Sequence, residues 1–91
     1  MEVIHLEIRG RVQGVGFRWF VREQAQALGL RGWVSNRPNG NVEIAAAGEA
    51  AALEKLALAA GKGPPGAVVE GVTKLPPPDG DSLPKPFGIV R

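Results

Sequence analysis

Apolar and polar residues alternate along the first part of the chain. Ile4, Leu6 and Ile8 recur at every second position, which places them on one face of an extended strand. From residue 17 to residue 28 the apolar spacing changes to three and four, the period of a helix that buries one face. The pattern therefore predicts a half-buried strand over residues 3–12, followed closely by a helix over residues 17–28.

The remaining apolar stretches predict further strands and a second helix. The expected elements are strands over residues 31–36, 41–47 and 67–75, a helix that Gly48 and Glu49 open and Gly61 ends, and a terminal edge strand over residues 87–91. Residues 36–40 predict a turn, and residues 75–86, rich in Pro, Gly and Asp, predict an exposed loop. An uneven alternation near Gly71 indicates a β-bulge.

The order of these elements predicts the fold. Strand, helix, strand, strand, helix, strand, with a short extra C-terminal strand, is typical of a ferredoxin-like α+β two-layer sandwich with a mostly antiparallel sheet. The first strand–helix–strand unit is a crossover, so its two strands run parallel and their C-terminal ends lie at one edge. With one strand between them, these ends are about 10 Å apart. Residues 1–91 are expected to form a single domain, since a chain of this size builds one core.

A glycine-rich loop joins the first strand to the first helix. Gly10, Gly14 and Gly16 allow tight turns and leave no Cβ between the backbone and a ligand. Backbone N–H groups of such a turn, together with those of the helix N-terminus, favour an anion. Arg18 follows, with a planar guanidinium that matches phosphate oxygens. The loop therefore predicts a cradle for a small tetrahedral anion.

Asn36 lies near the end of the second strand, at the sheet edge that also carries the loop. Its uncharged amide offers a donor and an acceptor, which suits the holding of a water molecule in line with phosphorus. The alternative is that Asn36 only begins a turn, which asparagine favours. The alternative for Arg18 is that it is only a solvated surface residue. The positive end of the helix dipole disfavours a cation at that position.

Two stretches of the chain resemble the signatures of a known family. Residues 8–18 resemble the first signature of acylphosphatases, in the run Ile8-x-Gly10-x-Val12-Gln13-Gly14-Val15-x-Phe17-Arg18. Residues 32–42 resemble the second, in the run Gly32-Trp33-Val34-x-Asn36-x-x-x-Gly40-x-Val42. The order of elements agrees as well, so the resemblance covers nearly the whole chain. It implies hydrolysis of the carboxyl–phosphate bond of acyl phosphates to a carboxylate and inorganic phosphate, without a metal or another cofactor.

Carried onto this chain, the resemblance assigns roles to two side chains. Arg18 binds the substrate phosphate, and Asn36 orients the attacking water. The phosphate-binding residues that the resemblance implies are Gln13, Gly14, Val15, Gly16, Phe17 and Arg18. Phosphoryl transfer passes through a loose transition state, so positioning and charge stabilisation supply most of the catalysis. The leaving carboxylate needs no general acid, and a phosphate oxygen of the substrate is one acceptor for the water proton.

Composition narrows the function classes further. The absence of cysteine excludes disulfides, thiolate metal ligands and a phosphocysteine intermediate. His5 is the single histidine and is expected to be an ordinary surface residue rather than a metal ligand. No apolar run approaches the ~20 residues of a membrane span, and the N-terminus lacks a secretory pattern. We expect a cytoplasmic protein, a monomer by default, whose partner is a small-molecule acyl phosphate.

Two other functions share this architecture. An anion-binding or regulatory module without turnover has the same loop, and similar domains occur within hydrogenase-maturation carbamoyltransferases. RNA-binding sandwiches place aromatic residues on the exposed sheet face for base stacking. Here the first strand carries His5, Glu7 and Arg9 on that face, and the third carries Glu43 and Ala45. The net charge of +2, spread along the chain, also disfavours a nucleic-acid partner.

Overall fold

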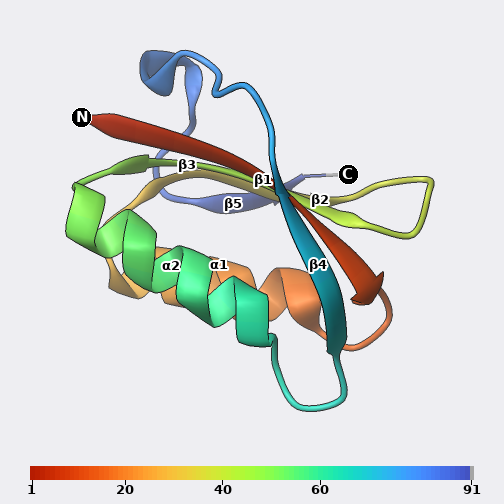
Figure 1. The fold of residues 1–91 in the computed structure, drawn as a ribbon. Helices are drawn as coiled ribbons and strands as arrows, with labels where there is room; N and C mark the ends of the chain where they lie inside the picture. The colour runs from red at the N-terminus through yellow and green to blue at the C-terminus, as the bar shows by residue number, and fades with distance from the viewer. Residues whose placement is uncertain (91) are drawn as a thin grey trace.

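The computed structural model describes residues 1–90, which form a five-stranded sheet with two helices on one face (Figure 1). In chain order the elements are β1 (Glu2–Arg11), α1 (Phe17–Ala27), β2 (Arg31–Asn36), β3 (Val42–Gly48), α2 (Ala50–Lys62), β4 (Val68–Lys74), the 3₁₀ turn η1 (Gly80–Ser82) and β5 (Gly88–Val90). This order confirms the predicted ferredoxin-like α+β sandwich. Arg91, which was expected in the last strand, lies outside the described residues.

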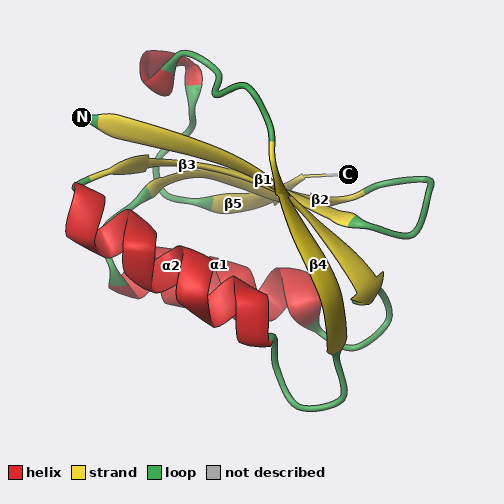
Figure 2. Ribbon diagram, viewed as in Figure 1, coloured by secondary structure: helices red, strands yellow, loops and turns green. Residues whose placement is uncertain are grey.

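The sheet has the strand order β4-β1-β3-β2-β5. β1 and β2 are each antiparallel to β3, which lies between them, so β1 and β2 run parallel, as predicted. Their C-terminal ends therefore lie at the same end of the sheet. β5 extends the sheet beyond β2 (Figure 2). It runs parallel to β2, with Val34 opposite Ile89.

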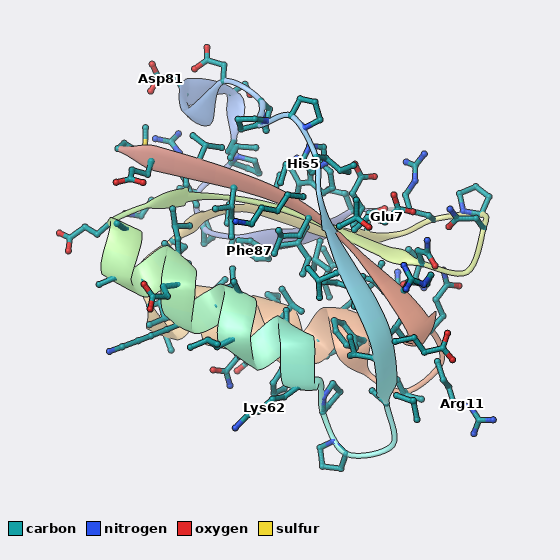
Figure 3. All side chains as sticks on the ribbon, in the orientation of Figure 1. His5, Glu7, Arg11, Lys62, Asp81 and Phe87 are labelled. Atoms are coloured by element: carbon teal, nitrogen blue, oxygen red, sulfur yellow. The ribbon has the colours of Figure 1, made fainter. Side chains whose placement is uncertain are left out.

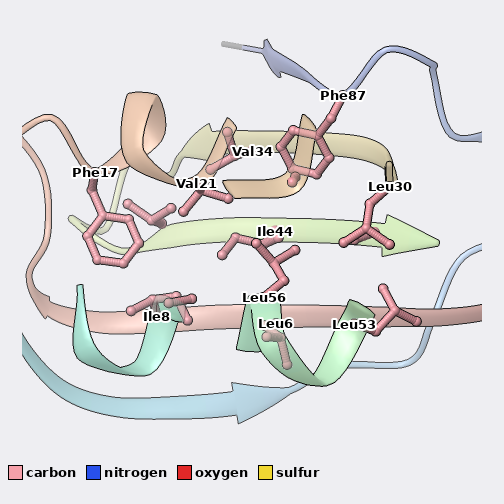
Figure 4. Close-up of a cluster of buried hydrophobic side chains, with 14 of the residues drawn as sticks. Leu6, Ile8, Phe17, Val21, Leu30, Val34, Ile44, Leu53, Leu56 and Phe87 are labelled. Atoms are coloured by element: carbon pink, nitrogen blue, oxygen red, sulfur yellow. The ribbon is translucent and has the colours of Figure 1, made fainter. Parts of the chain in front are cut away.

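The core lies between the sheet and the two helices (Figure 4). Its residues are the inward positions of the alternating and helical patterns, among them Leu6, Ile8 and Phe17, each no more than 3% exposed. Phe87 closes the core beside α1, where Gln26 Nε2 donates a hydrogen bond to the Phe87 carbonyl (2.8 Å). Because β1 and α1 are both held by this core, the loop between them has rigid supports on both sides.

β4 approaches β1 closely because Gly10 has no side chain. Gly10 has φ +132°, and a Cβ there would lie 2.1 Å from a carbonyl oxygen of the β4 segment. The β1–β4 pairing passes from Arg9–Gly71 to Gly10–Val69 and leaves Glu70 as the extra residue. This irregularity confirms the bulge that the sequence indicated.

Residues 75–86, predicted to be an exposed loop, cover part of the sheet face opposite the helices (Figure 1). Leu83 is 2% exposed and packs on small residues of β3. The segment is held by hydrogen bonds from the Gly32 N–H to the Pro84 carbonyl (2.8 Å) and from Arg31 Nε to the Leu83 carbonyl (2.9 Å). Most of the segment is exposed, as predicted, but Gly80 and Leu83 are buried. The sequence showed no sign of this because two isolated inward residues produce no periodic signal.

α2 ends later than predicted. The helix passes through Gly61 and includes Lys62. Gly63 is the residue with a positive φ, +73°, and its N–H donates to the Ala59 carbonyl (2.9 Å). The end shifts by about half a turn because Gly63, and not Gly61, adopts the conformation that glycine tolerates. No helix within residues 1–90 has the length and hydropathy that crossing a membrane requires.

Candidate active site

The glycine-rich loop leaves β1 and leads directly into the N-terminus of α1. Gly14 and Gly16 both have φ +76°, a left-handed conformation that glycine adopts without strain. Gly16 is the N-cap and has no side chain with which to cap the helix. The first hydrogen bond of the helix runs from the Phe20 N–H to the Gly16 carbonyl (3.0 Å), so the N–H groups of residues 17–19 have no partner within α1. The first turn also holds no acidic residue, which leaves its positive dipole end available to an anion.

A cavity of about 290 Å³ opens beside this loop. The predicted site residues that line it are Gly14, Gly16, Phe17, Arg18 and Asn36. The rest of the lining consists of Val12, Trp19 and Ile89. The structure therefore brings both predicted catalytic side chains into one cavity, as the parallel arrangement of β1 and β2 requires.

Arg18 is the second residue of α1 and is half-buried at the wall of the cavity. Among residues 1–90 its guanidinium forms no ion pair with a carboxylate. A guanidinium carries a permanent charge and five N–H donors in a fixed plane. In this position those donors are available to the oxygens of a phosphate.

Asn36 ends β2 and reaches the same cavity. Its Oδ1 atom is buried and accepts no hydrogen bond from the described residues. Leaving a buried amide oxygen unpaired costs about 1–3 kcal/mol, so folding stability alone does not account for this side chain. Asn36 also lines the cavity, so its amide can hold a water molecule that enters there.

Gln13 contributes through its side chain, which the sequence analysis missed. Its Nε2 donates to the carbonyls of Arg37 (2.8 Å) and Asn41 (2.9 Å), the two ends of the β2–β3 turn. The turn is also closed by the Arg37 N–H, which donates to the Asn41 carbonyl (2.8 Å). Because Asn36 directly precedes Arg37, the Gln13 amide ties the loop to the segment that carries Asn36. Neither Gln13 nor Val15 lines the cavity, and Val15 packs against the core.

The substitution Gln13→Met keeps the length of this side chain and removes both donors. We expect kcat for acyl phosphate hydrolysis to fall about tenfold, because the turn that holds Asn36 loosens. The Ki of inorganic phosphate is expected to change by less than about twofold, because the predicted cradle consists of backbone N–H groups and Arg18. Steady-state kinetics with phosphate as a competitive inhibitor separate the two effects. Gln24→Met, at an exposed position of α1, is the matched control, and a raised Ki with unchanged kcat would contradict the role given to Gln13.

Glu7 holds the same turn from the sheet face opposite the helices (Figure 3). Its Oε2 accepts hydrogen bonds from Asn41 Nδ2 (2.7 Å) and Asn39 Nδ2 (3.1 Å). These hydrogen bonds, of which the one from Asn41 has the larger effect, hold the pKa of Glu7 below its ordinary value of 4.5. The ionised form of Glu7 is therefore the form that stabilises the turn.

The lowered pKa of Glu7 makes its contribution to stability depend on pH. A carboxyl whose pKa is lower in the folded state stabilises the fold above its unfolded pKa, and the contribution disappears as pH falls through the folded value. Glu7→Gln is therefore expected to lower the free energy of unfolding at neutral pH, with a difference that shrinks below about pH 4.5. Urea unfolding of both proteins between about pH 7 and pH 3 measures it. A difference that does not vary with pH would show that the charge of Glu7 is not involved.

His5, expected to be an ordinary surface residue, is half-buried on the open face of the sheet. Its Nε2 pairs with Glu43, which also pairs with Arg37 (3.1 Å), and its ring meets Trp33 edge-on at 5.7 Å between centroids. Arg37 offsets the repulsion between Glu43 and Glu7, which lie opposite each other in the β1–β3 register. None of these side chains lines the cavity, so they support the sheet and the turn.

A larger cavity, of about 460 Å³, lies at the opposite end of the sheet. Its lining mixes both charges, with Glu2 and Glu49 beside Arg31 and Lys85, and includes none of the predicted catalytic or phosphate-binding residues. Within the described part of the chain, no three His, Cys, Asp or Glu side chains are grouped so as to hold a metal ion. The chemistry predicted from the sequence is thus concentrated around the smaller cavity.

Comparison with known proteins identifies the family. The family model for acylphosphatase matches residues 4–83. An acylphosphatase of Thiobacillus denitrificans is 50% identical over 72 residues, which span 79% of this chain and 81% of the relative. The chain belongs to the acylphosphatase family. Its activity is therefore the hydrolysis of acyl phosphates, which confirms what the resemblance implied.

Solved structures of acylphosphatases have the same fold. The crystal structure of acylphosphatase from Bacillus subtilis aligns with a TM-score of 0.92 at 37% identity, over the whole of both chains. Full-length HypF in its phosphate- and nucleotide-bound form aligns with a TM-score of 0.77 at 32% identity, over 99% of this chain and 12% of HypF. The acylphosphatase fold therefore also occurs within a much longer protein.

Proposed function

We propose that this acylphosphatase works by direct attack of a water molecule on the phosphorus of its substrate. One observation carries the proposal: a single cavity is lined both by Arg18, whose guanidinium has no carboxylate partner in the described chain, and by Asn36, whose amide oxygen accepts no hydrogen bond there. The guanidinium is suited to binding a phosphate, and the amide is suited to holding a water molecule.

In this mechanism the phosphoryl group is bound by charge-assisted hydrogen bonds. Arg18 donates to phosphate oxygens, and backbone N–H groups at Gly14, at Gly16 and in the first turn of α1 surround the group from the side of the loop. The uncapped N-terminus of α1 supports this arrangement, because its free N–H groups and dipole favour negative charge. Donors held in place before the reaction stabilise the charge of the transition state without reorganising.

The reacting atoms follow from the placement of Asn36. The water that the Asn36 amide holds attacks phosphorus, and a bond forms between phosphorus and the water oxygen. The bond from phosphorus to the bridging oxygen breaks, and its electron pair leaves with the carboxylate. The water proton passes to a phosphate oxygen. The cavity lining supports this assignment, because Arg18 is the one ionisable side chain among the described residues that line it, and a guanidinium cannot accept a proton.

Hydrolysis of benzoyl phosphate in ¹⁸O-labelled water tests this direction of attack. Attack at phosphorus places the label in inorganic phosphate, which is the expected result. Attack at the carbonyl carbon would place the label in benzoate and would overturn the proposal. Mass spectrometry of both products distinguishes the two outcomes.

The proposed chemistry requires no metal ion. We expect phosphate release from benzoyl phosphate to proceed at an unchanged rate in excess chelator, because Arg18 and backbone N–H groups stabilise the charge that a metal would otherwise stabilise. Parallel assays with and without EDTA measure this. A rate that falls in EDTA and returns on addition of a divalent cation would contradict the prediction.

We further propose a single domain that acts as a monomer in the cytoplasm, as the sequence analysis expects. Sedimentation equilibrium across the concentration range of the assay tests the monomer. A mass that rises with concentration within that range would contradict it.

A further inference from the structure

The cavity is larger than a phosphate requires. Its volume is about 290 Å³, whereas a single water needs about 10–15 Å³ of such volume. A phosphoryl group has the size of a few waters and therefore fills only part of the space. The remainder is available to the part of the substrate that is bonded to the phosphate, which is the acyl group.

Trp19 is the exposed apolar residue of the lining. It is 59% exposed, whereas Val12 and Phe17 are each 1% exposed and Ile89 is half-buried. Trp19 directly follows Arg18 in the first turn of α1. A large indole surface therefore lies at the mouth of the cavity, next to the group that binds the phosphate.

The ring of Trp19 is already held in place from one side. The guanidinium carbon of Arg22 lies 3.9 Å from the ring centroid, a cation–π contact within α1. Arg22 also pairs with Glu23 (3.3 Å). With one face covered, the rest of the indole is available to a ligand, and the prior ordering of the side chain lowers the entropy cost of binding.

The direction of attack determines on which side of phosphorus the acyl group lies. A displacement in line places the leaving oxygen on the side of phosphorus opposite the water at Asn36. The acyl group then extends away from Asn36 and out of the cradle. We propose that Trp19 is a specificity-determining residue that packs against the acyl group, so that the enzyme favours aromatic or extended apolar acyl phosphates over acetyl phosphate. This inference rests on the proposed phosphate cradle and adds the substrate class.

The test compares benzoyl phosphate with acetyl phosphate in wild-type protein and in Trp19→Ala. The ratio of kcat/KM for benzoyl phosphate to kcat/KM for acetyl phosphate is expected to fall about three- to tenfold in Trp19→Ala. Trp19→Phe is expected to recover most of the ratio, because it restores an aromatic face. Leu58→Ala, which removes an exposed apolar side chain from α2 (64% exposed), is the matched control and is expected to leave the ratio unchanged.

Different measurements test the role of Trp19 and the phosphate cradle. An unchanged ratio in Trp19→Ala, or an equal loss for both substrates, would overturn the role of Trp19. The Ki of inorganic phosphate reports on the cradle alone and is expected to stay within about twofold of the wild-type value in Trp19→Ala. Wild-type protein in which inorganic phosphate does not compete with either substrate would instead contradict the cradle itself.

Discussion

Replacing Arg18 by alanine is expected to lower kcat/KM for benzoyl phosphate by about 10³-fold, the largest effect of any single substitution proposed for this chain. The guanidinium lies in the cavity without a carboxylate partner in the described chain, so its charge is available to the phosphate in both the ground state and the transition state. The Ki of inorganic phosphate should therefore rise as well, by about tenfold or more. Steady-state hydrolysis and competitive inhibition measure the two quantities.

The controls for Arg18 separate position from charge. Arg11→Ala removes another arginine next to the loop, at the exposed end of β1 (Figure 3), and is expected to change kcat/KM by less than about threefold. Arg18→Lys keeps the charge but lacks the planar guanidinium, so its kcat/KM is expected to lie between those of wild type and Arg18→Ala. Circular dichroism checks that each variant is folded. If folded Arg18→Ala kept more than about a tenth of wild-type kcat/KM, the assignment of the phosphate-binding residue would be wrong.

Replacing Asn36 by alanine is expected to lower kcat by about 10²- to 10³-fold while the Ki of inorganic phosphate stays within about twofold. In the proposed mechanism the Asn36 amide places the water, and no other lining side chain offers a carboxylate or an amide to replace it. Other groups bind the phosphate in this mechanism, so its affinity is expected to stay unchanged. The split between kcat and Ki is the measurement that separates the role of Asn36 from that of Arg18.

Gln24→Ala, at an exposed position of α1, is the control for loss of an amide elsewhere and is expected to retain full activity. Asn36→Asp keeps the shape of the side chain but adds a negative charge, which is expected to lower kcat and also raise the Ki of phosphate by repulsion. Nearly full turnover in Asn36→Ala would refute the water-holding role. A raised Ki with normal kcat would instead make Asn36 a phosphate ligand.

The placement of the two proposed catalytic side chains could be predicted because each lies at the end of an element with a clear pattern. β2 coincides with the predicted strand, and α1 begins at the predicted residue. The parallel relation of β1 and β2 follows from the crossover, which is nearly always right-handed and brings both C-terminal ends to one edge. Arg18 and Asn36 then meet at one cavity without any knowledge of their side-chain contacts.

The missed features are contacts between side chains that lie far apart in the sequence. Gln13 finds its partners 24 and 28 residues away, and periodicity carries no information about such pairs. The same holds for Leu83, which packs against the sheet face opposite the helices. Trp33 lies on that face beside His5, but the search for exposed aromatic residues covered only the first and third strands. Trp19 lies within the predicted helix, and its position at the cavity emerged only from the fold.

A crystal structure with inorganic phosphate bound is the most direct test of the cradle. The account predicts the ion in the cavity of Gly14 and Gly16, with its oxygens about 3 Å from the Arg18 guanidinium and from backbone N–H groups of the loop. It also predicts the Asn36 side chain facing phosphorus across the space of one water. Phosphate bound elsewhere, or an Asn36 amide turned away from the ion, would contradict it.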